Sequence, residues 1–358
     1  MDDYQAVQIT EPGRLELVPV TSTPLKPGMA RLRMETIGIC ASDVAVLKGA
    51  HPFAHYPVIS GHEMCGIIEE VEGAGPYQVG QRVAVEPMVA CGQCSSCNQG
   101  HPNRCDQVQV MGIQLQGGMA QCLEVNQTQL HPVPPMMDAE MAAMIEPTAV
   151  AVHVCNRSKM KEGDRIAVVG TGKIGLLILA VAKARGASAL FGVDVVPARL
   201  DHAKRMGAQS TALNAEDSAL HKAREAAVEG FDAVFDTAGE PGSLLLATQI
   251  ARTGGTVVPL ALPHQGFPMD FRPFYRKELT LRAARMYNVE FQEATELLAS
   301  GSVAPRSLIT HRLPLAQAVA GFELAANHPD QAVKVIIQAQ EAQSIRLGTT
   351  SSREFTYE

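Results

Sequence analysis

Apolar and polar residues alternate in short runs along the first third of the chain, and Pro or Gly residues separate the runs. Runs of this kind cover residues 4–10, 14–18, 30–37, 65–71, 82–86 and 120–125. An apolar residue at every second position is typical of a strand that buries one face, and Pro and Gly favour the turns between such strands. We therefore expect a β-rich domain at the start of the chain.

After Gly163 the pattern changes to short apolar runs that alternate with segments of helical period. A helix is expected from the glycine-rich stretch to Arg185, and another near 243–251. The strands expected here cover residues 165–169, 189–193, 231–235 and 256–262. Strands and helices in alternation favour a parallel sheet with helices on both faces. The expected fold class is therefore α/β, with a doubly wound second domain.

Strands and helices continue to alternate beyond Arg276. The elements expected are strands at 279–284, 307–312 and 332–337 and helices near 291–298 and 315–326. Some of these elements are expected to return to the first domain and complete it. The tail from Ala339 is polar and rich in Ser and Thr, so we expect it to be loosely ordered.

The size of the chain also indicates two domains, and its charge indicates the kind of ligand. A chain of 358 residues with 46% hydrophobic content is too long for one ordinary core. A net charge of −7 without blocks of like charge disfavours nucleic acid and membrane surfaces as partners, so a small molecule is expected. The first residues lack a secretory signal pattern and no apolar run is long enough to span a bilayer, which predicts a cytoplasmic protein.

Half of the eight cysteines lie in one short stretch, as Cys91, Cys94, Cys97 and Cys105. Thiolates at this spacing allow one loop to surround a tetrahedral ion, and four protein ligands make a closed, structural zinc site. A Cys-x-x-Cys redox pair is the weaker alternative because no thioredoxin-like pattern surrounds the stretch, and the spacing differs from that of iron–sulfur proteins. The other unpaired thiols are expected to be buried, namely Cys65, Cys122 and Cys155.

A second set of metal-ligating side chains is spread over three stretches of the sequence. Cys40 follows the third expected strand, His62 and Glu63 precede the fourth, and Glu146 stands in an Ile-Glu-Pro sequence. Zn²⁺ accepts thiolate, imidazole and carboxylate together, and such a site can keep one position open for chemistry. Taken singly, Cys40 is equally interpreted as a core thiol and His62 as a buried histidine, whereas an acid at a helix start is the weaker alternative for Glu146.

The sequence Gly170-Thr-Gly-Lys-Ile-Gly175 lies between an expected strand and an expected helix, and Asp194 ends the next strand. This order is that of a dinucleotide-binding unit, in which the helix N-terminus faces the pyrophosphate and the acid binds the adenosine ribose. Neither Arg nor Lys follows Asp194 directly to meet a 2′-phosphate, so NAD is expected rather than NADP. Arg199 is equally interpreted as a solvated helix charge. The predicted cofactor-binding residues are Gly170, Gly172, Lys173, Ile174, Gly175, Asp194, Arg199 and Leu260.

Together these motifs resemble the zinc-containing medium-chain dehydrogenase/reductase superfamily over residues 4–338. The resemblance implies a GroES-like catalytic domain made from residues 1–150 and 288–358, with the tail 339–358 loosely ordered. It implies a Rossmann domain, residues 151–287, between these segments, with the active site in the cleft. It also implies one catalytic and one structural zinc per chain, and a homodimer or homotetramer.

The resemblance further implies a role for each residue of the catalytic site. Ser42 takes the proton of the substrate hydroxyl, and Asp43 orients His62. Ala45 stands where many alcohol dehydrogenases have a histidine that passes this proton to solvent, so the proton must leave by another route. The catalytic zinc ligands implied are Cys40, His62, Glu146 and, as an additional or exchangeable ligand, Glu63.

Within the superfamily, Glu146 followed by proline stands where many alcohol dehydrogenases place a cysteine ligand, which is similar to sorbitol, threonine and sugar-acid dehydrogenases. The segment 52–57 and the sequence Arg285-Met-Tyr-Asn most resemble the branch of gulonate and galactonate 5-dehydrogenases. Arg285 matches an arginine that polyol dehydrogenases use near the substrate, and a guanidinium binds a carboxylate with two parallel hydrogen bonds. An ion pair between domains is an equal interpretation of Arg285.

The expected function is hydride transfer from a secondary alcohol of a polyol or sugar acid to NAD⁺, with zinc as the Lewis acid. A threonine-type amino-alcohol dehydrogenase is the alternative within the same class. A catalytically silent NAD-binding or sensing protein is the alternative from another class, although the complete set of zinc ligands argues against it.

Overall fold

The computed structural model describes residues 3–214, 218–262 and 266–340. The polar tail expected to be loosely ordered lies outside the described residues from position 341 onward. Its first two residues are packed against the protein. Ala339 is buried, and the Gln340 side chain donates hydrogen bonds of 3.0 Å to the carbonyl oxygens of Met34 and Gln121.

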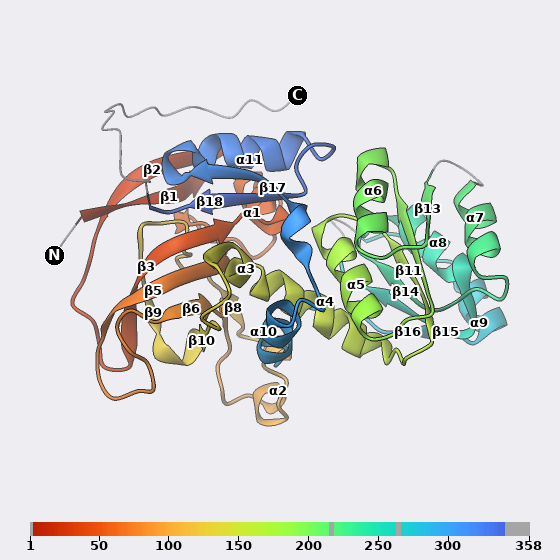
Figure 1. The fold of residues 1–358 in the computed structure, drawn as a ribbon, viewed down its shortest axis with the longest axis horizontal. Coiled ribbons are helices and arrows are strands. Elements are labelled where there is room, and N and C mark those ends of the chain that lie inside the picture. The colour runs from red at the N-terminus through yellow and green to blue at the C-terminus, as the bar shows by residue number, and fades with distance from the viewer. Residues whose placement is uncertain (1–2, 215–217, 263–265, 341–358) are drawn as a thin grey trace. The chain divides into compact units, whose positions relative to one another are not determined.

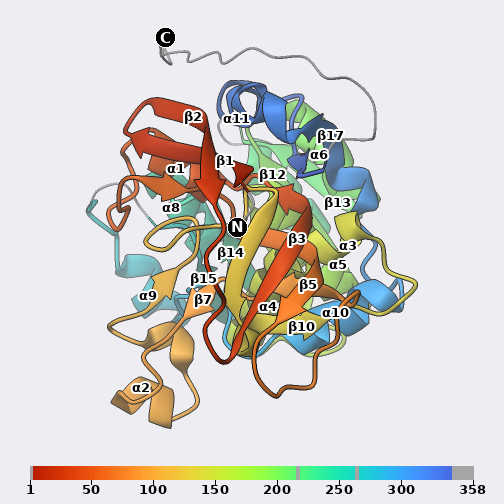
Figure 2. The same cartoon turned by 90° about the vertical axis from the view of Figure 1, so that its left-hand side faces the viewer.

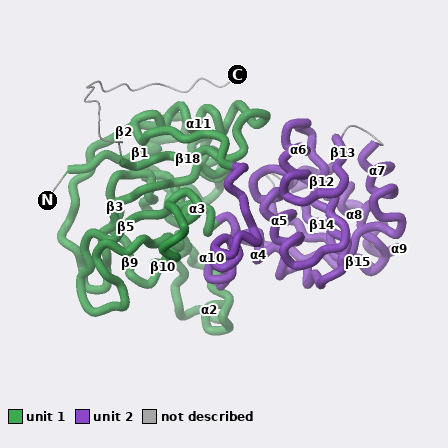
Figure 3. Tube along the Cα trace, viewed as in Figure 1, with its two compact units in different colours: residues 1–146, 309–358 green, residues 147–308 purple. Residues whose placement is uncertain are grey.

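The chain forms two compact units (Figure 3). Unit 1 is residues 1–146 together with 309–358, and unit 2 is residues 147–308. The sequence analysis places the domain boundaries after residues 150 and 287. The two units meet after residues 146 and 308, so the main difference is at the second boundary. Helix α10 (Phe291–Ala299) belongs to unit 2, where Glu293 accepts a 2.6 Å hydrogen bond from Arg185.

Unit 1 contains the strands that the alternating pattern predicts. A three-stranded sheet has the order β2-β1-β4, and a seven-stranded sheet has the order β10-β6-β5-β3-β18-β17, with β9 paired to β3. The strands are β1 (Asp3–Glu11), β2 (Arg14–Thr21), β3 (Met29–Gly38), β4 (Val58–Ile59), β5 (Glu63–Val71), β6 (Arg82–Val85), β9 (Cys122–Asn126), β10 (Leu130–Pro132), β17 (Ile309–Pro314) and β18 (Lys334–Gln338). The C-terminal strand β18 lies between β3 and β17, so the end of the chain completes the sheet that its beginning starts (Figure 1).

Strand β3 shows how the pattern produces the core of unit 1. Ala30, Leu32 and Met34 have no exposed surface, and the residues between them are half-buried. This alternation gives the strand one apolar face, which packs into a cluster with residues such as Ile9 and Ile337. Burial of each such large aliphatic side chain contributes about 2 kcal/mol.

Helix α1 (Ala41–Leu47) is not predicted by the alternating pattern. Its N-cap is Cys40, and the Asp43 side chain accepts a 2.7 Å hydrogen bond from the Cys40 backbone N–H, which satisfies a donor at the start of the helix. Val44, Val46 and Leu47 then bury one face. The structure therefore has a capped helix after β3, where the sequence analysis predicts no helix.

The other helices of unit 1 are short. They are α2 (Ser95–Asn98), α3 (Ala139–Ala143) and α11 (Ala318–Asn327), of which the sequence predicts only α11. Figure 2 shows the cysteine-rich loop with α2 extending away from the sheets of unit 1. Within the described ranges, no helix of either unit combines the length and the apolar character needed to cross a membrane.

Unit 2 is built on six parallel strands in the order β13-β12-β11-β14-β15-β16. Counted from the first strand of the unit this is 3-2-1-4-5-6, the order of a dinucleotide-binding Rossmann fold. The strands are β11 (Arg165–Val169), β12 (Ala189–Asp194), β13 (Ser210–Leu213), β14 (Phe231–Asp236), β15 (Ala251–Pro259) and β16 (Thr280–Leu281). The predicted α/β class is confirmed, but β16 is shorter than the predicted 279–284, because it is an edge strand whose two residues are both exposed.

Helices connect these strands and cover the sheet (Figure 1). Helices α5 and α6 pack together, as do α7 with α8 and α8 with α9. Beneath them the stacked rings of Phe191 and Phe231, with centroids 5.4 Å apart, fill the core. The helices are α4 (Ile145–Ser158), α5 (Lys173–Ala184), α6 (Pro197–Arg205), α7 (Ser218–Ala226), α8 (Pro241–Ile250) and α9 (Arg272–Lys277).

A buried carboxylate fixes the segment between β16 and α10. The Glu290 side chain accepts hydrogen bonds from the backbone N–H groups of Asn288 and Val289 at 2.5 and 2.9 Å, and from the Asn156 side chain at 3.2 Å. His153 Nδ1 lies 2.9 Å from the same carboxylate. Burial alone would raise the pKa of Glu290, but His153 and the backbone donors outweigh it and lower the pKa to about 2. One carboxylate therefore ties α4 to the start of α10.

We expect Glu290→Gln to lower the free energy of unfolding by about 2 kcal/mol at pH 7, because an uncharged amide binds these donors less strongly. Because its pKa is lowered, the carboxylate stabilises the fold fully at pH values above its ordinary pKa of 4.5. This stabilisation is lost as the pH falls toward 2. Urea unfolding at pH 7 and pH 3 should therefore show a smaller difference between variant and wild type in acid. Glu296→Gln, at an exposed position on α10, is the matched control. An equal loss at both pH values would contradict the assignment.

Candidate active site

Three side chains of unit 1 bring a thiol, an imidazole and a carboxylate together. Cys40 is the N-cap of α1, His62 lies in the turn before β5, and Glu63 is the first residue of β5. One ligand atom of each residue lies within 4.8 Å of the other two. Sulfur, imidazole nitrogen and carboxylate oxygen are donors that zinc accepts, so these residues fit such an ion.

Glu146, the remaining predicted ligand of this metal, lies in the first turn of α4 and is half-buried. It does not belong to the group formed by Cys40, His62 and Glu63 in the described part of the chain. Its role as a zinc ligand therefore stays a prediction.

Asp43 connects the parts of this site and is completely buried. Its Oδ2 accepts the hydrogen bond from the Cys40 N–H, and its Oδ1 accepts hydrogen bonds from the Ser60 hydroxyl at 2.9 Å and the Gly61 N–H at 3.3 Å. The same Oδ1 lies 3.2 Å from Nδ1 of His62. A carboxylate in this position orients the imidazole and leaves Nε2 as the atom that can bind a metal.

Asp43 and His62 each stabilise the charged form of the other. Burial would raise the pKa of Asp43, but the attraction of His62 and hydrogen bonds from Cys40 and Ser60 lower it to about 2. Burial would lower the pKa of His62, but Asp43 and then Cys40 raise it well above its ordinary value. Ser42 Oγ lies 3.2 Å from His62 Nε2, so the hydroxyl assigned to proton transfer reaches the imidazole.

A buried lysine that the sequence analysis does not identify stands beside this group. Lys334, the first residue of β18, is 1% exposed, and its Nζ forms an ion pair with Oε2 of Glu63. The same ammonium donates a 3.2 Å hydrogen bond to the carbonyl oxygen of Ile39. Gly38 leaves room for the pair, because a Cβ there would clash with Lys334 Nζ and the Glu63 carboxylate. The signal in the sequence is one charged residue in the apolar run Ala332-Val-Lys-Val-Ile-Ile.

The four cysteines of the loop around α2 form a second group, with ligand atoms within 4.8 Å of one another. The sulfur of Cys97 lies 3.5 Å from that of Cys94 and 4.0 Å from that of Cys91. Sulfur atoms at about 2.3 Å from a tetrahedral zinc are about 3.8 Å apart, so this group also fits zinc. Backbone hydrogen bonds from Gln93 and Cys94 lower the pKa of Cys91 to about 6, which favours the thiolate that a metal needs.

The remaining thiols are not metal ligands among the described residues. Cys65 and Cys155 are fully buried, and Cys122 is half-buried. Burial raises the pKa of Cys155 to about 12 and that of Cys122 to about 11. These groups stay protonated near neutral pH and contribute to packing.

In unit 2 the glycine-rich loop connects β11 to α5, and Gly172 is the N-cap of the helix. Gly170 has a φ of +92°, and a Cβ at Gly175 would clash with the Gly170 carbonyl oxygen, so both positions need glycine. The Asp194 carboxylate accepts a 2.6 Å hydrogen bond from the backbone N–H of Thr171. Asp194 therefore holds the loop in place, a role that the ribose-binding motif alone does not predict.

The other predicted cofactor and substrate residues are found at separate places in unit 2. Lys173 and Ile174 form the first turn of α5. Arg199 Nη1 lies 3.8 Å from Asp194 Oδ1. Leu260 follows β15 at the carboxyl ends of the parallel strands, where dinucleotides bind. Arg285 is exposed in the segment after β16.

These two units define the class of protein. A β-rich unit with a Cys-His-Glu group and a four-cysteine loop, followed by a Rossmann unit, is typical of a zinc- and dinucleotide-dependent oxidoreductase. Comparison with known families agrees, because the alcohol dehydrogenase GroES-like domain matches residues 26–135 and the zinc-binding dehydrogenase domain matches residues 174–300.

Curated relatives extend over most of the chain. Sorbitol dehydrogenase of Bacillus subtilis is 32% identical over 314 residues, which cover 86% of this chain and 89% of the relative. L-galactonate-5-dehydrogenase of Escherichia coli is also 32% identical over 314 residues, which cover 86% of this chain and 91% of the relative. The chain therefore belongs to the zinc-containing medium-chain alcohol dehydrogenase family, in its sugar and polyol branch, and is an NAD(P)-dependent oxidoreductase of that class.

Solved structures show the same fold. The dehydrogenase rspB of Escherichia coli CFT073, in complex with NADH, has a TM-score of 0.89 and 27% identity and covers 94% of this chain and 100% of its own. A zinc-binding dehydrogenase of Sinorhizobium meliloti 1021, bound to NADP, has a TM-score of 0.88 and 27% identity with the same coverage. The predicted resemblance and fold class are confirmed.

We expect Lys334→Met to lower the free energy of unfolding by about 3 kcal/mol, because it leaves the Glu63 carboxylate buried without its partner. The double variant Lys334→Met with Glu63→Gln should recover part of this loss, because no uncompensated charge then remains. Urea unfolding followed by circular dichroism measures both effects. Lys26→Met, at an exposed position of unit 1, is the control and should change stability by less than about 0.5 kcal/mol. An unchanged transition in Lys334→Met would show that the pair does not contribute to stability.

Proposed function

We propose that the protein oxidises a secondary alcohol of a polyol or sugar acid, with NAD⁺ as the hydride acceptor. The observation that carries the proposal is the arrangement around His62. Asp43 lies beside one ring nitrogen and Ser42 beside the other, and the Cys40 sulfur lies within 4.8 Å of a ring nitrogen. This arrangement combines metal ligands with a hydroxyl that can move a proton. The sorbitol and L-galactonate dehydrogenases among the relatives support a polyhydroxylated substrate.

In this proposal Cys40, His62 and Glu146 hold the catalytic zinc, and Glu63 is an additional or exchangeable ligand. A bound zinc ion supplies the Lewis acidity that makes a substrate hydroxyl easier to deprotonate. Asp43 fixes the ring of His62 through Nδ1, so that Nε2 would be the nitrogen that binds the metal. In this arrangement Glu63 would bind the metal while its Oε2 is paired with the buried Lys334 ammonium.

Ser42 is the residue that we assign to proton transfer. Its hydroxyl is half-buried and lies 3.2 Å from His62 Nε2. A hydroxyl can accept one proton while it donates its own, so Ser42 can pass the proton of the substrate toward solvent. Ala45 has no group that continues this transfer, so water would carry the proton onward.

For the cofactor we propose NAD⁺, bound at the carboxyl ends of β11 and β12. The N-terminus of α5 then faces the pyrophosphate and Asp194 faces the ribose. When bound there, NAD⁺ would supply the acceptor for the hydride. The two residues after Asp194 are Val195 and Val196, which offer no positive charge to a 2′-phosphate, and this supports NAD over NADP. Similar structures bind NADH in one case and NADP in another, so the choice depends on such local residues.

For the substrate we propose that Arg285 binds the carboxylate of a sugar acid, because its exposed guanidinium can form two parallel hydrogen bonds. We further propose a cytoplasmic homodimer or homotetramer with one catalytic and one structural zinc per chain. The four-cysteine loop supports a reducing compartment, because its thiolates need protection from oxidation.

Initial rates with NAD⁺ on pentitols, hexitols, aldonates, L-threonine and simple primary alcohols test the proposal. We expect turnover on at least one polyol or aldonate, and a loss of about a thousandfold in Cys40→Ser, because a serine hydroxyl is a poor zinc ligand. Turnover on L-threonine alone would favour the amino-alcohol alternative. Activity only on primary alcohols, or a near-normal rate in Cys40→Ser, would contradict the proposal.

The matched control is Cys122→Ser, which changes a half-buried thiol outside both metal groups and should keep its rate within about twofold. Metal analysis should find two zinc ions per wild-type chain and one in Cys40→Ser. One zinc per wild-type chain, held by the four-cysteine loop, would favour a silent NAD-binding protein.

We expect Asp194→Ser to weaken NADH binding by about tenfold or more and to narrow the preference for NADH over NADPH, because the ribose loses its acceptor and the repulsion of a 2′-phosphate disappears. Fluorescence titration with both nucleotides measures the two dissociation constants. Asp201→Ser, at an exposed position on α6, is the control and should leave both unchanged. If Asp194→Ser weakens the binding of NADH and NADPH equally, the carboxylate acts through the Thr171 loop and not through the ribose.

A further inference from the structure

The segment 283–290 of unit 2, between β16 and α10, is held firmly where it leaves the sheet. The backbone N–H of Ala284 donates a 3.0 Å hydrogen bond to the carbonyl oxygen of Pro259 at the end of β15. Nε of Arg157, on α4, donates a 3.0 Å hydrogen bond to the carbonyl oxygen of Ala283. The start of the segment is therefore fixed by a strand and by a helix of the same unit.

The end of the segment is fixed by a buried ring and a buried carboxylate. Tyr287 has no exposed surface, and its ring meets that of Phe291 edge-on with centroids 5.0 Å apart. The Glu290 carboxylate accepts the hydrogen bonds from the backbone N–H groups of Asn288 and Val289. Two consecutive backbone donors thus converge on one acidic side chain, which closes a tight turn before α10.

Helix α4 holds this carboxylate from the other side. His153 Nδ1 lies 2.9 Å from Glu290 Oε1, and the Asn156 side chain donates a 3.2 Å hydrogen bond to the same oxygen. Residues three and four positions apart lie side by side on a helix, so His153, Asn156 and Arg157 share one face of α4. That single face contacts both the start and the end of the segment 283–290.

Arg285 lies between these two fixed points and is exposed. The next residue, Met286, has a φ of +54°, a left-handed conformation that is uncommon for a residue with a side chain. Such a conformation persists only where the surrounding contacts hold it. The direction in which the backbone presents Arg285 therefore depends on the contacts that hold its neighbours.

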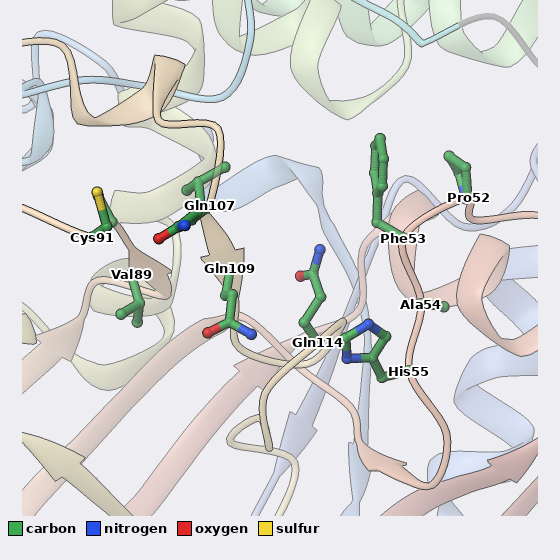
Figure 4. Close-up of a pocket in the computed structure, with 11 residues that line it drawn as sticks. Pro52, Phe53, Ala54, His55, Val89, Cys91, Gln107, Gln109 and Gln114 are labelled. Carbon is green, nitrogen blue, oxygen red and sulfur yellow. The ribbon is translucent and has the colours of Figure 1, made fainter. Parts of the chain in front are cut away.

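The pocket of unit 1 shown in Figure 4 is lined by amides and an imidazole. It lies between the segment 52–55 and the paired strands β7 (Met88–Val89) and β8 (Gln109–Val110). The lining side chains that carry nitrogen or oxygen are His55, Gln107, Gln109 and Gln114. Neither lysine nor arginine occurs among its described lining residues, although these cations bind a carboxylate most strongly. Within the proposed function, the group that binds the carboxylate is Arg285.

We propose that Glu290 is a positioning residue for Arg285. By holding the turn after Met286 against His153, it fixes the place of the guanidinium, and a fixed group loses less freedom when it binds a ligand. The inference rests on the proposed function, which assigns Arg285 to the carboxylate of a sugar acid. It adds a specificity: Glu290 contributes to the affinity for a sugar acid and not to that for the corresponding polyol, which has no carboxylate.

Binding of L-galactonate and galactitol to the zinc-loaded full-length protein, measured by NMR titration, tests the inference apart from turnover. The two ligands share one carbon chain and differ by a carboxylate in place of a hydroxymethyl group. We expect Glu290→Gln to weaken L-galactonate about tenfold, because the amide holds the turn less firmly, and to change galactitol by less than about twofold.

A second variant and a matched control accompany this comparison. His153→Gln removes one partner of Glu290 and should weaken L-galactonate in the same direction by a smaller factor. Glu296→Gln makes the same change at an exposed position on α10 and should leave both ligands unchanged. Circular dichroism at the temperature of the titration identifies the variants that are folded, and His153→Gln carries the test if Glu290→Gln is not.

A double-mutant cycle shows whether Glu290 acts through Arg285. Arg285→Met should itself weaken L-galactonate, and in this background Glu290→Gln should cause no further loss, because the group that it positions is gone. A side chain that only stabilises the fold would weaken both ligands alike, and its effect would add to that of Arg285→Met.

The inference is overturned if folded Glu290→Gln leaves L-galactonate binding unchanged, weakens both ligands equally, or adds its full effect to that of Arg285→Met. It is also overturned, together with the role of Arg285, if wild type does not bind L-galactonate or if Arg285→Met binds it as tightly as wild type. If Arg285→Met weakens L-galactonate and folded Glu290→Gln does not, the positioning inference fails alone. If all variants bind as expected but wild type oxidises no polyol or aldonate, the proposed function fails alone.

Discussion

The candidate active site depends on one buried carboxylate. Asp43 binds the start of α1 through the Cys40 N–H, the turn before β5 through Ser60 and Gly61, and the ring of His62. These partners come from separate parts of the chain, and each one offers a donor or a positive charge to the same group. A fully buried charge is stable only with such partners, so the charge and the geometry of the site depend on each other. The helix cap, the turn and the imidazole are therefore positioned together.

A second buried charge sets the role of Glu63. Its ion pair with Lys334 lies next to the Cys40–His62 group and is shielded from water. Buried ion pairs contribute less to net stability than their contact suggests, because both charges lose hydration. Their effect is on the arrangement of the site. His62 and Glu63 are adjacent in the sequence and are both possible metal ligands, but in the structure they have different partners. Asp43 holds Nδ1 of His62, and the Lys334 ammonium holds the Glu63 carboxylate.

The sequence predicts the sheets better than the details of the site. Period-two alternation identifies β3, because a strand with one buried face has an apolar residue at every second position. Continuous apolar runs together with the glycines identify the Rossmann sheet, because its strands are buried on both faces. Helix α1 is missed, since its cap depends on Asp43, whose other partners lie in the turn before β5. Strand β13 is missed because Ser210-Thr-Ala-Leu is short and partly polar. The pairing of Lys334 with Glu63 is beyond any local pattern, because it joins residues at opposite ends of the chain.

The place of β18 in the sheet has a consequence for the order of folding during synthesis. Unit 2 is one continuous segment, so a ribosome releases all of it before the last strands of unit 1 appear. Until residues 334–338 emerge, the Thr36–Gly38 end of β3 lacks its neighbour β18, and the Glu63 carboxylate lacks the Lys334 ammonium. The nucleotide-binding unit can therefore fold first, and the metal-binding unit reaches its final state only at the end of translation. A chain truncated before Lys334 would retain the first of these units and lose the second.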